Sequence, residues 1–87
     1  MDLNLKTHKI TLYNDDKLSF EYIMASLIRF CNHTLEQAEQ CALIAHNTGK
    51  CDVISGPFFE MYEIKNRFDM LTIKSEIEEY AGSMHKW

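Results

Sequence analysis

The feature that most constrains the fold is an abrupt change from apolar to acidic residues near the start of the chain. Ile10 and Leu12 lie two residues apart, the spacing that places both on one face of a β-strand. The run ends at Asn14, Asp15 and Asp16, whose side chains compete for nearby backbone donors and so favour a turn. A helical pattern follows this turn. The sequence therefore predicts acceptor oxygens at the end of a strand, beside the start of a helix.

Two helices with recognisable ends are expected next. Apolar residues recur at three-and-four spacing over residues 20–31, and Ser19 is placed to cap the N-terminus. Thr34 and Gln37 have the spacing of a capping box, and they begin a second helix that Gly49 ends. The inward positions expected on the second helix are Leu35, Ala38, Cys41, Ala42 and Ala45. Its alanines would let another element or a ligand approach the helix closely.

The second half of the chain repeats the alternation of strand and helix. Residues 50–55 are expected to form a second strand, and Pro57 is well placed to open a third helix. After Leu71 the period changes from helical to alternating, which indicates a final strand over residues 73–78. One small sheet covered on one face by three helices would bury these apolar stripes. The expected class is therefore α+β, in the order β-α-α-β-α-β.

Length and charge limit what the protein can do. At 87 residues the chain suffices for one core, and we expect a domain over residues 9–80 with tails at 1–8 and 81–87. A net charge of −4 disfavours nonspecific binding to nucleic acid. The longest apolar run is too short for a bilayer, and no N-terminal segment has the pattern of a secretion signal. We therefore expect a cytoplasmic monomer with no membrane or nucleic-acid partner.

Several short motifs, taken together, give the chain a resemblance to a known family. They are Asn14-Asp15-Asp16, Glu21, Glu36-x-Ala38, His46-x-x-Gly49-Lys50, Glu60 and Lys65. At these separations they resemble the ClpS family, adaptors of the Clp protease that recognise N-degrons, which are proteins with particular N-terminal residues. The resemblance covers about residues 8 to 80. It implies a three-stranded antiparallel sheet with three helices, in agreement with the order read above.

The resemblance also implies a site, namely one that binds a peptide whose first residue is bulky and hydrophobic. The residues matching those that hold the substrate's free α-amino group are Asn14, Asp15 and His46. The match places an apolar pocket for the first side chain around Leu18, Phe20, Ile23, Ala42, Ala45 and Ile73. A surface for the AAA+ unfoldase of the Clp machine would include Glu60 and Lys65.

The sequence departs from the usual family pattern in two places. Leu18-Ser19-Phe20 stands where the family usually has threonine-proline-methionine, and Ala42 replaces a common gating methionine. The pocket would thus have an aromatic residue on one wall and free space on the other. This leaves open which of Leu, Phe, Tyr and Trp is preferred as the first residue.

The residue types suit this chemistry. A protein N-terminus is an ammonium with three donors, and Asn14, Asp15 and neutral His46 offer an amide oxygen, a carboxylate and a ring nitrogen. Taken alone, Asn14-Asp15-Asp16 is more simply explained as a solvated turn, and His46 as a histidine near a helix end. The spacing of Cys31, Cys41 and Cys51 does not resemble paired metal hooks, so no metal or cofactor is expected.

Other activities compete with this interpretation. An acid–base pair of His46 and Asp15 is conceivable, but no nucleophile with an adjacent base is apparent, and we expect no enzyme. The alternative of a different class is a regulator with the same fold. Such a protein would bind the unfoldase and compete with substrates without delivering N-degrons.

Overall fold

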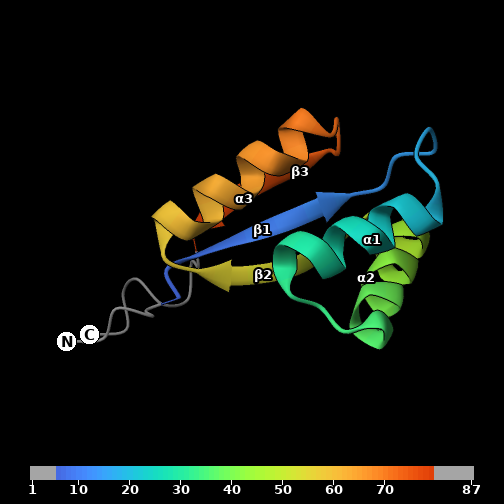
Figure 1. Ribbon diagram of the computed structural model, residues 1–87, viewed down its shortest axis with the longest axis horizontal. Coiled ribbons are helices and arrows are strands. Elements are labelled where there is room, and N and C mark those ends of the chain that lie inside the picture. The colour runs from blue at the N-terminus through green and yellow to red at the C-terminus, as the bar shows by residue number, and fades with distance from the viewer. Residues whose placement is uncertain (1–5, 80–87) are drawn as a thin grey trace.

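The computed structural model describes residues 6–79, which form a three-stranded antiparallel sheet and three helices. The elements are β1 (His8–Tyr13), α1 (Phe20–Cys31), α2 (Leu35–Thr48), β2 (Lys50–Gly56), α3 (Phe58–Met70) and β3 (Ser75–Glu79). The strand order is β2-β1-β3, so the first strand lies in the centre. The helices cover one face of the sheet, with α3 beside β3 and β1, and α1 and α2 beside β2 (Figure 1). The α+β class and the element order are as expected. Of the tails expected at 1–8 and 81–87, residues 1–5 and 81–87 lie outside the described residues, and His8 belongs to β1.

The helix ends follow the signals in the sequence. The Ser19 hydroxyl accepts a hydrogen bond from the Tyr22 N–H at 3.0 Å and caps α1. Thr34 and Gln37 form the complete capping box of α2, because each side chain accepts from the backbone N–H of the other. Gly49 ends α2 in a left-handed conformation with φ of +101°.

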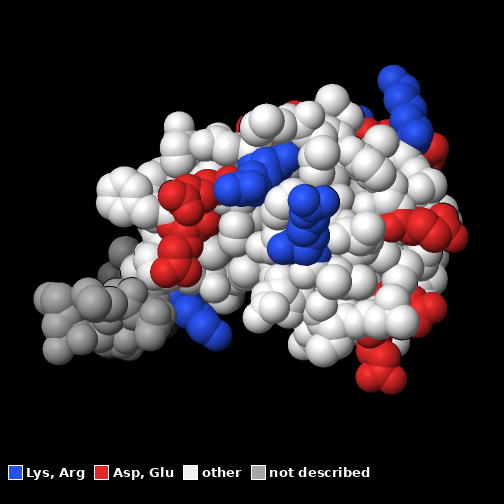
Figure 2. All heavy atoms as spheres, viewed as in Figure 1, with Lys and Arg blue, Asp and Glu red and all other residues white. Residues whose placement is uncertain are grey.

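The core lies between the sheet and the helices. Its most buried large side chains are those of Ile10, Leu12, Leu27, Met61 and Phe68. These residues come from β1, α1 and α3, so the central strand is covered by segments that are distant in the sequence. Arg29 of α1 and Arg67 of α3 each place a guanidinium carbon 5.7 Å from the centroid of the Phe30 ring, which links these two helices. Figure 2 shows basic side chains gathered where the two helices approach one another.

The opposite face of the sheet is polar, as is common for an antiparallel sheet packed on one side. The Lys9 ammonium contacts the Asp52 carboxylate at 3.0 Å, and the Thr11 hydroxyl donates to the same carboxylate at 2.9 Å. Burial alone would raise the pKa of Asp52, but the hydrogen bonds from Lys9 and Thr11 and the charges of Lys9 and Lys50 lower it. This network joins β1 to β2 next to a register shift between Ile10 and Thr11.

Two residues lie elsewhere than the sequence predicted, one expected in the core and one expected in the last strand. Leu35 is 65% exposed, because the first residue of α2 projects its side chain back beyond the end of the helix, away from the core. Ile73 precedes β3, which begins only at Ser75, since Thr72 adopts a left-handed conformation with φ of 59° and the chain turns there.

Candidate functional site

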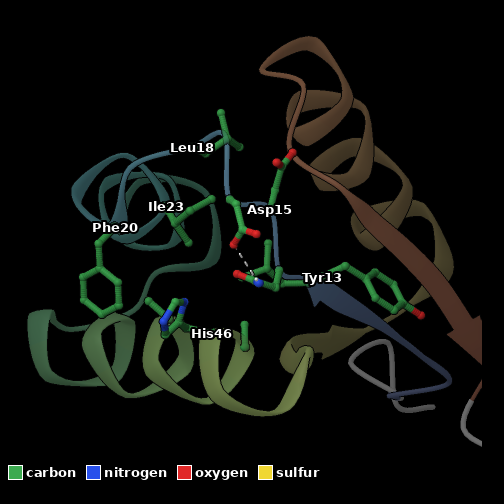
Figure 3. Close-up of a pocket in the computed structure, with 11 residues that line it drawn as sticks. Tyr13, Asp15, Leu18, Phe20, Ile23 and His46 are labelled. Carbon is green, nitrogen blue, oxygen red and sulfur yellow. Dashed lines mark hydrogen bonds between the residues drawn. The ribbon is translucent and has the colours of Figure 1, made fainter.

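A cavity of about 220 Å³ lies where the end of β1 meets α1 and α2. Its lining residues come from β1, the following turn, the first turn of α1 and the second half of α2: Leu12, Tyr13, Asn14, Asp15, Asp16, Leu18, Phe20, Ile23, Ala42, Ala45 and His46. Figure 3 shows Phe20 and Ile23 facing His46 across the cavity, while Asp15 and Leu18 extend from the turn. One end of this cavity is therefore acidic and polar, and the rest is apolar.

A backbone hydrogen bond brings the polar residues together. The Asn14 N–H donates to the carbonyl oxygen of Gly49 at 2.9 Å. Because Gly49 ends α2 three residues after His46, this bond holds the turn after β1 beside the last turn of that helix. The pairing of Tyr13 with Lys50 in the sheet extends the same connection. The spacing His46-x-x-Gly49 thus places the imidazole and the acidic turn on one rim.

The rim supplies hydrogen-bond acceptors. The Asn14 side-chain amide donates to the Asp16 carboxylate at 3.3 Å, drawn as a dashed line in Figure 3, which leaves the Asn14 amide oxygen as an acceptor. Asp15 uses Oδ1 to accept from the Lys17 N–H at 2.9 Å, which leaves its second carboxylate oxygen available as an acceptor. Among residues 6–79, no lysine or arginine lines the cavity, and the two carboxylates suit a cationic ligand.

The walls of the cavity are apolar. Phe20 and Ile23 of α1 form one side, and Ala42 and Ala45 of α2 form the other. The two alanines are 5% and 3% exposed, and their short side chains leave the space that larger residues would occupy. A dry cavity of about 150 Å³ is enough to bind benzene, so this one has room for a large apolar side chain. Phe20 is a wall and does not fill the space.

Most of the residues expected from the sequence lie together here. Those that line the cavity are Asn14, Asp15, His46, Leu18, Phe20, Ile23, Ala42 and Ala45. The structure places Ile73 elsewhere: it is 2% exposed in the core and borders a separate groove with Lys65. Its place in the pocket depended on the register of the last strand, which begins two residues later.

Sequence reasoning missed three lining residues, namely Leu12, Tyr13 and Asp16. For Leu12 a signal was available, since it is the last inward residue of the strand before the acidic turn. Glu60 and Lys65 both lie on α3, outside this cavity. The Lys65 ammonium forms an ion pair with Asp69, one helical turn further on.

The three cysteines carry free thiols close to α2, and Cys41 interacts with both of the others. Burial, followed by the Cys41 thiol, raises the pKa of Cys31 to about 12. Burial and a hydrogen bond with Cys41 raise the pKa of Cys51 to about 12 as well. Within residues 6–79, no three His, Cys, Asp or Glu side chains are arranged to hold a metal ion, and no helix is both long and apolar enough to cross a membrane.

Comparisons with known proteins identify the fold and the family of the chain. In the solved structures, the chain is similar to ClpS2 of Agrobacterium tumefaciens bound to L-phenylalaninamide, with a TM-score of 0.72 and 17% identity. That match covers 86% of this chain and 98% of the other. A comparison with curated protein sequences finds no significant match. The family described as the ATP-dependent Clp protease adaptor protein ClpS matches residues 4–77, nearly the whole sequence. Because the family matches most of the sequence and the fold is that of ClpS2, the chain belongs to the ClpS family of Clp protease adaptors.

Proposed function

We propose that this adaptor binds the free N-terminus of proteins with a bulky hydrophobic first residue and delivers them to a Clp AAA+ unfoldase. The observation that carries this proposal is the cavity of about 220 Å³, which is apolar inside and bordered by Asn14, Asp15 and His46. The α-ammonium would lie at the acidic rim, and the first side chain would occupy the space beside Ala42 and Ala45. No catalytic step is involved.

The expected affinity follows from a small number of contacts. Charge-assisted hydrogen bonds to the ammonium contribute about 1.5–3 kcal/mol each. Burial of one large apolar side chain adds about 1.5–3 kcal/mol. Immobilising the peptide costs part of this gain. The remainder corresponds to a dissociation constant on the order of micromolar, which suits a carrier that releases its cargo.

The same contacts give selectivity for a free N-terminus. An acetylated N-terminus or an internal peptide bond lacks the positive charge and the three donors of an ammonium. Binding such a group would desolvate the second carboxylate oxygen of Asp15 without giving it a donor, at a cost of about 1–3 kcal/mol. A charged first side chain would meet the apolar walls formed by Phe20 and Ile23 and would be excluded.

A titration tests the recognition step. A fluorescent peptide beginning with Phe or Leu should bind with micromolar affinity, whereas its acetylated twin should bind at least about tenfold more weakly. Asp15→Ala should remove most of the affinity, and Glu36→Ala, at an exposed position in the first turn of α2, is the matched control. Equal affinity for the free and acetylated peptides would refute the proposal.

Delivery requires a second surface, for which we propose Glu60 and Lys65 of α3. Glu60→Ala should weaken docking to the unfoldase and leave the peptide affinity unchanged, because Glu60 does not border the cavity. A wild-type protein that docks on the unfoldase but binds no peptide with a free N-terminus would instead be a competitor of substrates.

A further inference from the structure

Two cysteine side chains meet where α2 lies against β2. Cys41 lies in the middle of α2, and Cys51 is the second residue of β2. A hydrogen bond joins their thiols, so the two side chains point toward one another. Both side chains pack against the core and are half-buried, whereas that of Cys31 is only 5% exposed. Of the three free thiols, Cys41 and Cys51 are therefore the two that a small solute can reach.

This pair of thiols lies beside two residues that line the cavity. Ala45 follows Cys41 by one helical turn on the same side of α2. Leu12 is the partner of Cys51 in the sheet, so their side chains lie on the same face. Ala45 and Leu12 both border the cavity. A covalent bond between Cys41 and Cys51 would therefore fix the distance between the α2 wall of the cavity and the strand beneath it.

We propose that Cys41 and Cys51 form an oxidation site, at which hydrogen peroxide converts the two thiols into a disulfide that ties α2 to β2. A disulfide requires two side chains that approach closely and face one another, and the thiol–thiol contact meets this requirement. Cys31 is less suited as a partner, because its side chain is buried and its interaction with Cys41 is electrostatic.

The oxidation proceeds in two steps. The Cys41 thiolate attacks one oxygen of the peroxide and breaks the O–O bond, which gives a sulfenic acid at Cys41, and the other oxygen leaves as water with the proton released by the thiol. The Cys51 sulfur then attacks the Cys41 sulfur, and the sulfenic hydroxyl leaves as water with the Cys51 proton. The two thiols together lose two electrons and two protons, and the peroxide is reduced to two molecules of water.

The order of these steps follows from the surroundings of the thiols. Burial is the main cause that raises the pKa of both Cys31 and Cys51 to about 12, so both are poor nucleophiles at neutral pH and the first attack falls to Cys41. The hydrogen bond and the charge of Cys41 also raise the pKa of Cys51. A sulfenic acid at Cys41 has lost the thiolate charge, so the first step makes Cys51 easier to deprotonate for the second.

The disulfide should narrow the cavity. A disulfide bond is about 2.0 Å long, which is well inside the separation of two sulfur atoms that are not bonded. Forming it draws α2 toward β2 and so moves Ala45 toward Leu12. The first side chain of a peptide would then have less room, and we expect oxidation to weaken binding of a peptide that begins with Phe at least about fivefold. This consequence, unlike the oxidation site itself, rests on the proposed function.

The test treats the full 87-residue chain with hydrogen peroxide in dilute solution and removes the excess with catalase. Mass spectrometry of unreduced peptides should find a disulfide within one chain between Cys41 and Cys51. The affinity for the Phe peptide should fall after oxidation and return on treatment with dithiothreitol. This reversal separates the disulfide from sulfoxides of methionine, because dithiothreitol alone is not expected to reduce those.

Two substitutions serve as matched variants. Cys31→Ala should still form the disulfide, because the proposed pair is intact. Cys51→Ser cannot form it, and its affinity for the Phe peptide should stay within about twofold of its untreated value after the same oxidation. Neither residue lines the cavity. Circular dichroism of each reduced variant checks that the fold is retained.

The outcomes separate this inference from the proposed recognition of N-termini. Wild-type protein that keeps free thiols, that pairs Cys31 with Cys41, or that forms only disulfides between chains would overturn the oxidation site, whatever the peptide titration gives. A Cys41–Cys51 disulfide that leaves the affinity within twofold of the reduced protein would overturn the narrowing of the cavity. The same disulfide in a protein that binds no peptide even when reduced would support the oxidation site and refute the recognition step.

Discussion

The most discriminating perturbation of the peptide site is Ala42→Leu. Ala42 is 5% exposed and lines the cavity opposite Phe20 and Ile23. The introduced side chain would extend into a space of about 220 Å³ that the folded protein leaves empty. The substitution therefore competes with the first side chain of a peptide for the same volume, while it demands little rearrangement of the core.

The two effects of this substitution have opposite signs. Losing the burial of the first side chain removes about 1.5–3 kcal/mol of binding free energy, which weakens binding about 10- to 150-fold. The three added carbon atoms bury apolar surface at about 0.8 kcal/mol each, so the free energy of unfolding should stay constant or rise by up to about 2 kcal/mol. A substitution that merely damaged the fold would lower both quantities.

The assay pairs a titration of a peptide beginning with Phe with thermal unfolding followed by circular dichroism. Ala42→Val should give an intermediate loss of affinity, because it fills less of the space. Ala25→Leu, at an exposed position of α1, is the control and should alter neither measurement by much. A folded Ala42→Leu protein that binds the peptide within twofold of wild type would show that the cavity does not receive the first side chain.

Three further predictions concern the framework around the site. Gly49→Ala should lower the free energy of unfolding by about 1–2 kcal/mol in a urea titration, because φ of +101° strains any other residue although space for a Cβ is open. The pKa of Asp52 is lowered in the folded protein, so its carboxylate contributes stability above its ordinary pKa of 3.8, and this stability is lost as the pH falls through the folded pKa. Asp52→Asn should therefore make the free energy of unfolding depend less on pH in the acid range. The pKa values of Cys31 and Cys51 are raised from 9.0 to about 12, so both thiols should react slowly with iodoacetamide at pH 8 unless the protein is unfolded. The stability that these protonated thiols give should be present below pH 9.0 and decline as the pH rises toward about 12. Rapid labelling of Cys31 or Cys51 in the folded protein, located by mass spectrometry of peptides, would contradict this prediction.

Local signals in the sequence determined where the elements begin and end. The caps at Ser19, at Thr34 with Gln37 and at Gly49 are as predicted. Each depends on hydrogen bonds or backbone angles within a few residues, and such interactions are encoded by neighbouring side chains. The change of period after Leu71 likewise predicted the last strand, although that strand begins at Ser75.

The lining of the cavity was predictable in part. The polar turn and His46 are linked through Gly49, a connection that the resemblance implied by its spacing and that the structure supplies as a hydrogen bond. Ile73 and Leu12 show what the sequence could not predict about the lining. Leu12 is an apolar residue of a strand, and Ile73 is an apolar residue just before one. Only the register of the strands and the packing of the helices decide that Leu12 borders the cavity and Ile73 does not.

Exposure on the helices was decided by tertiary packing. Leu35 belongs to an apolar pattern that the sequence alone would bury, yet it is 65% exposed, and Phe59 of α3 is 79% exposed. A helical period shows which residues share a face, but it does not show where the sheet beneath that face ends. The sequence by itself therefore determined the order of elements, their caps and the chemistry of the polar rim. The empty volume beside Ala42 and the exposed rings at the start of α3 arise only where segments distant in the sequence meet, because they depend on how much space those segments leave unfilled.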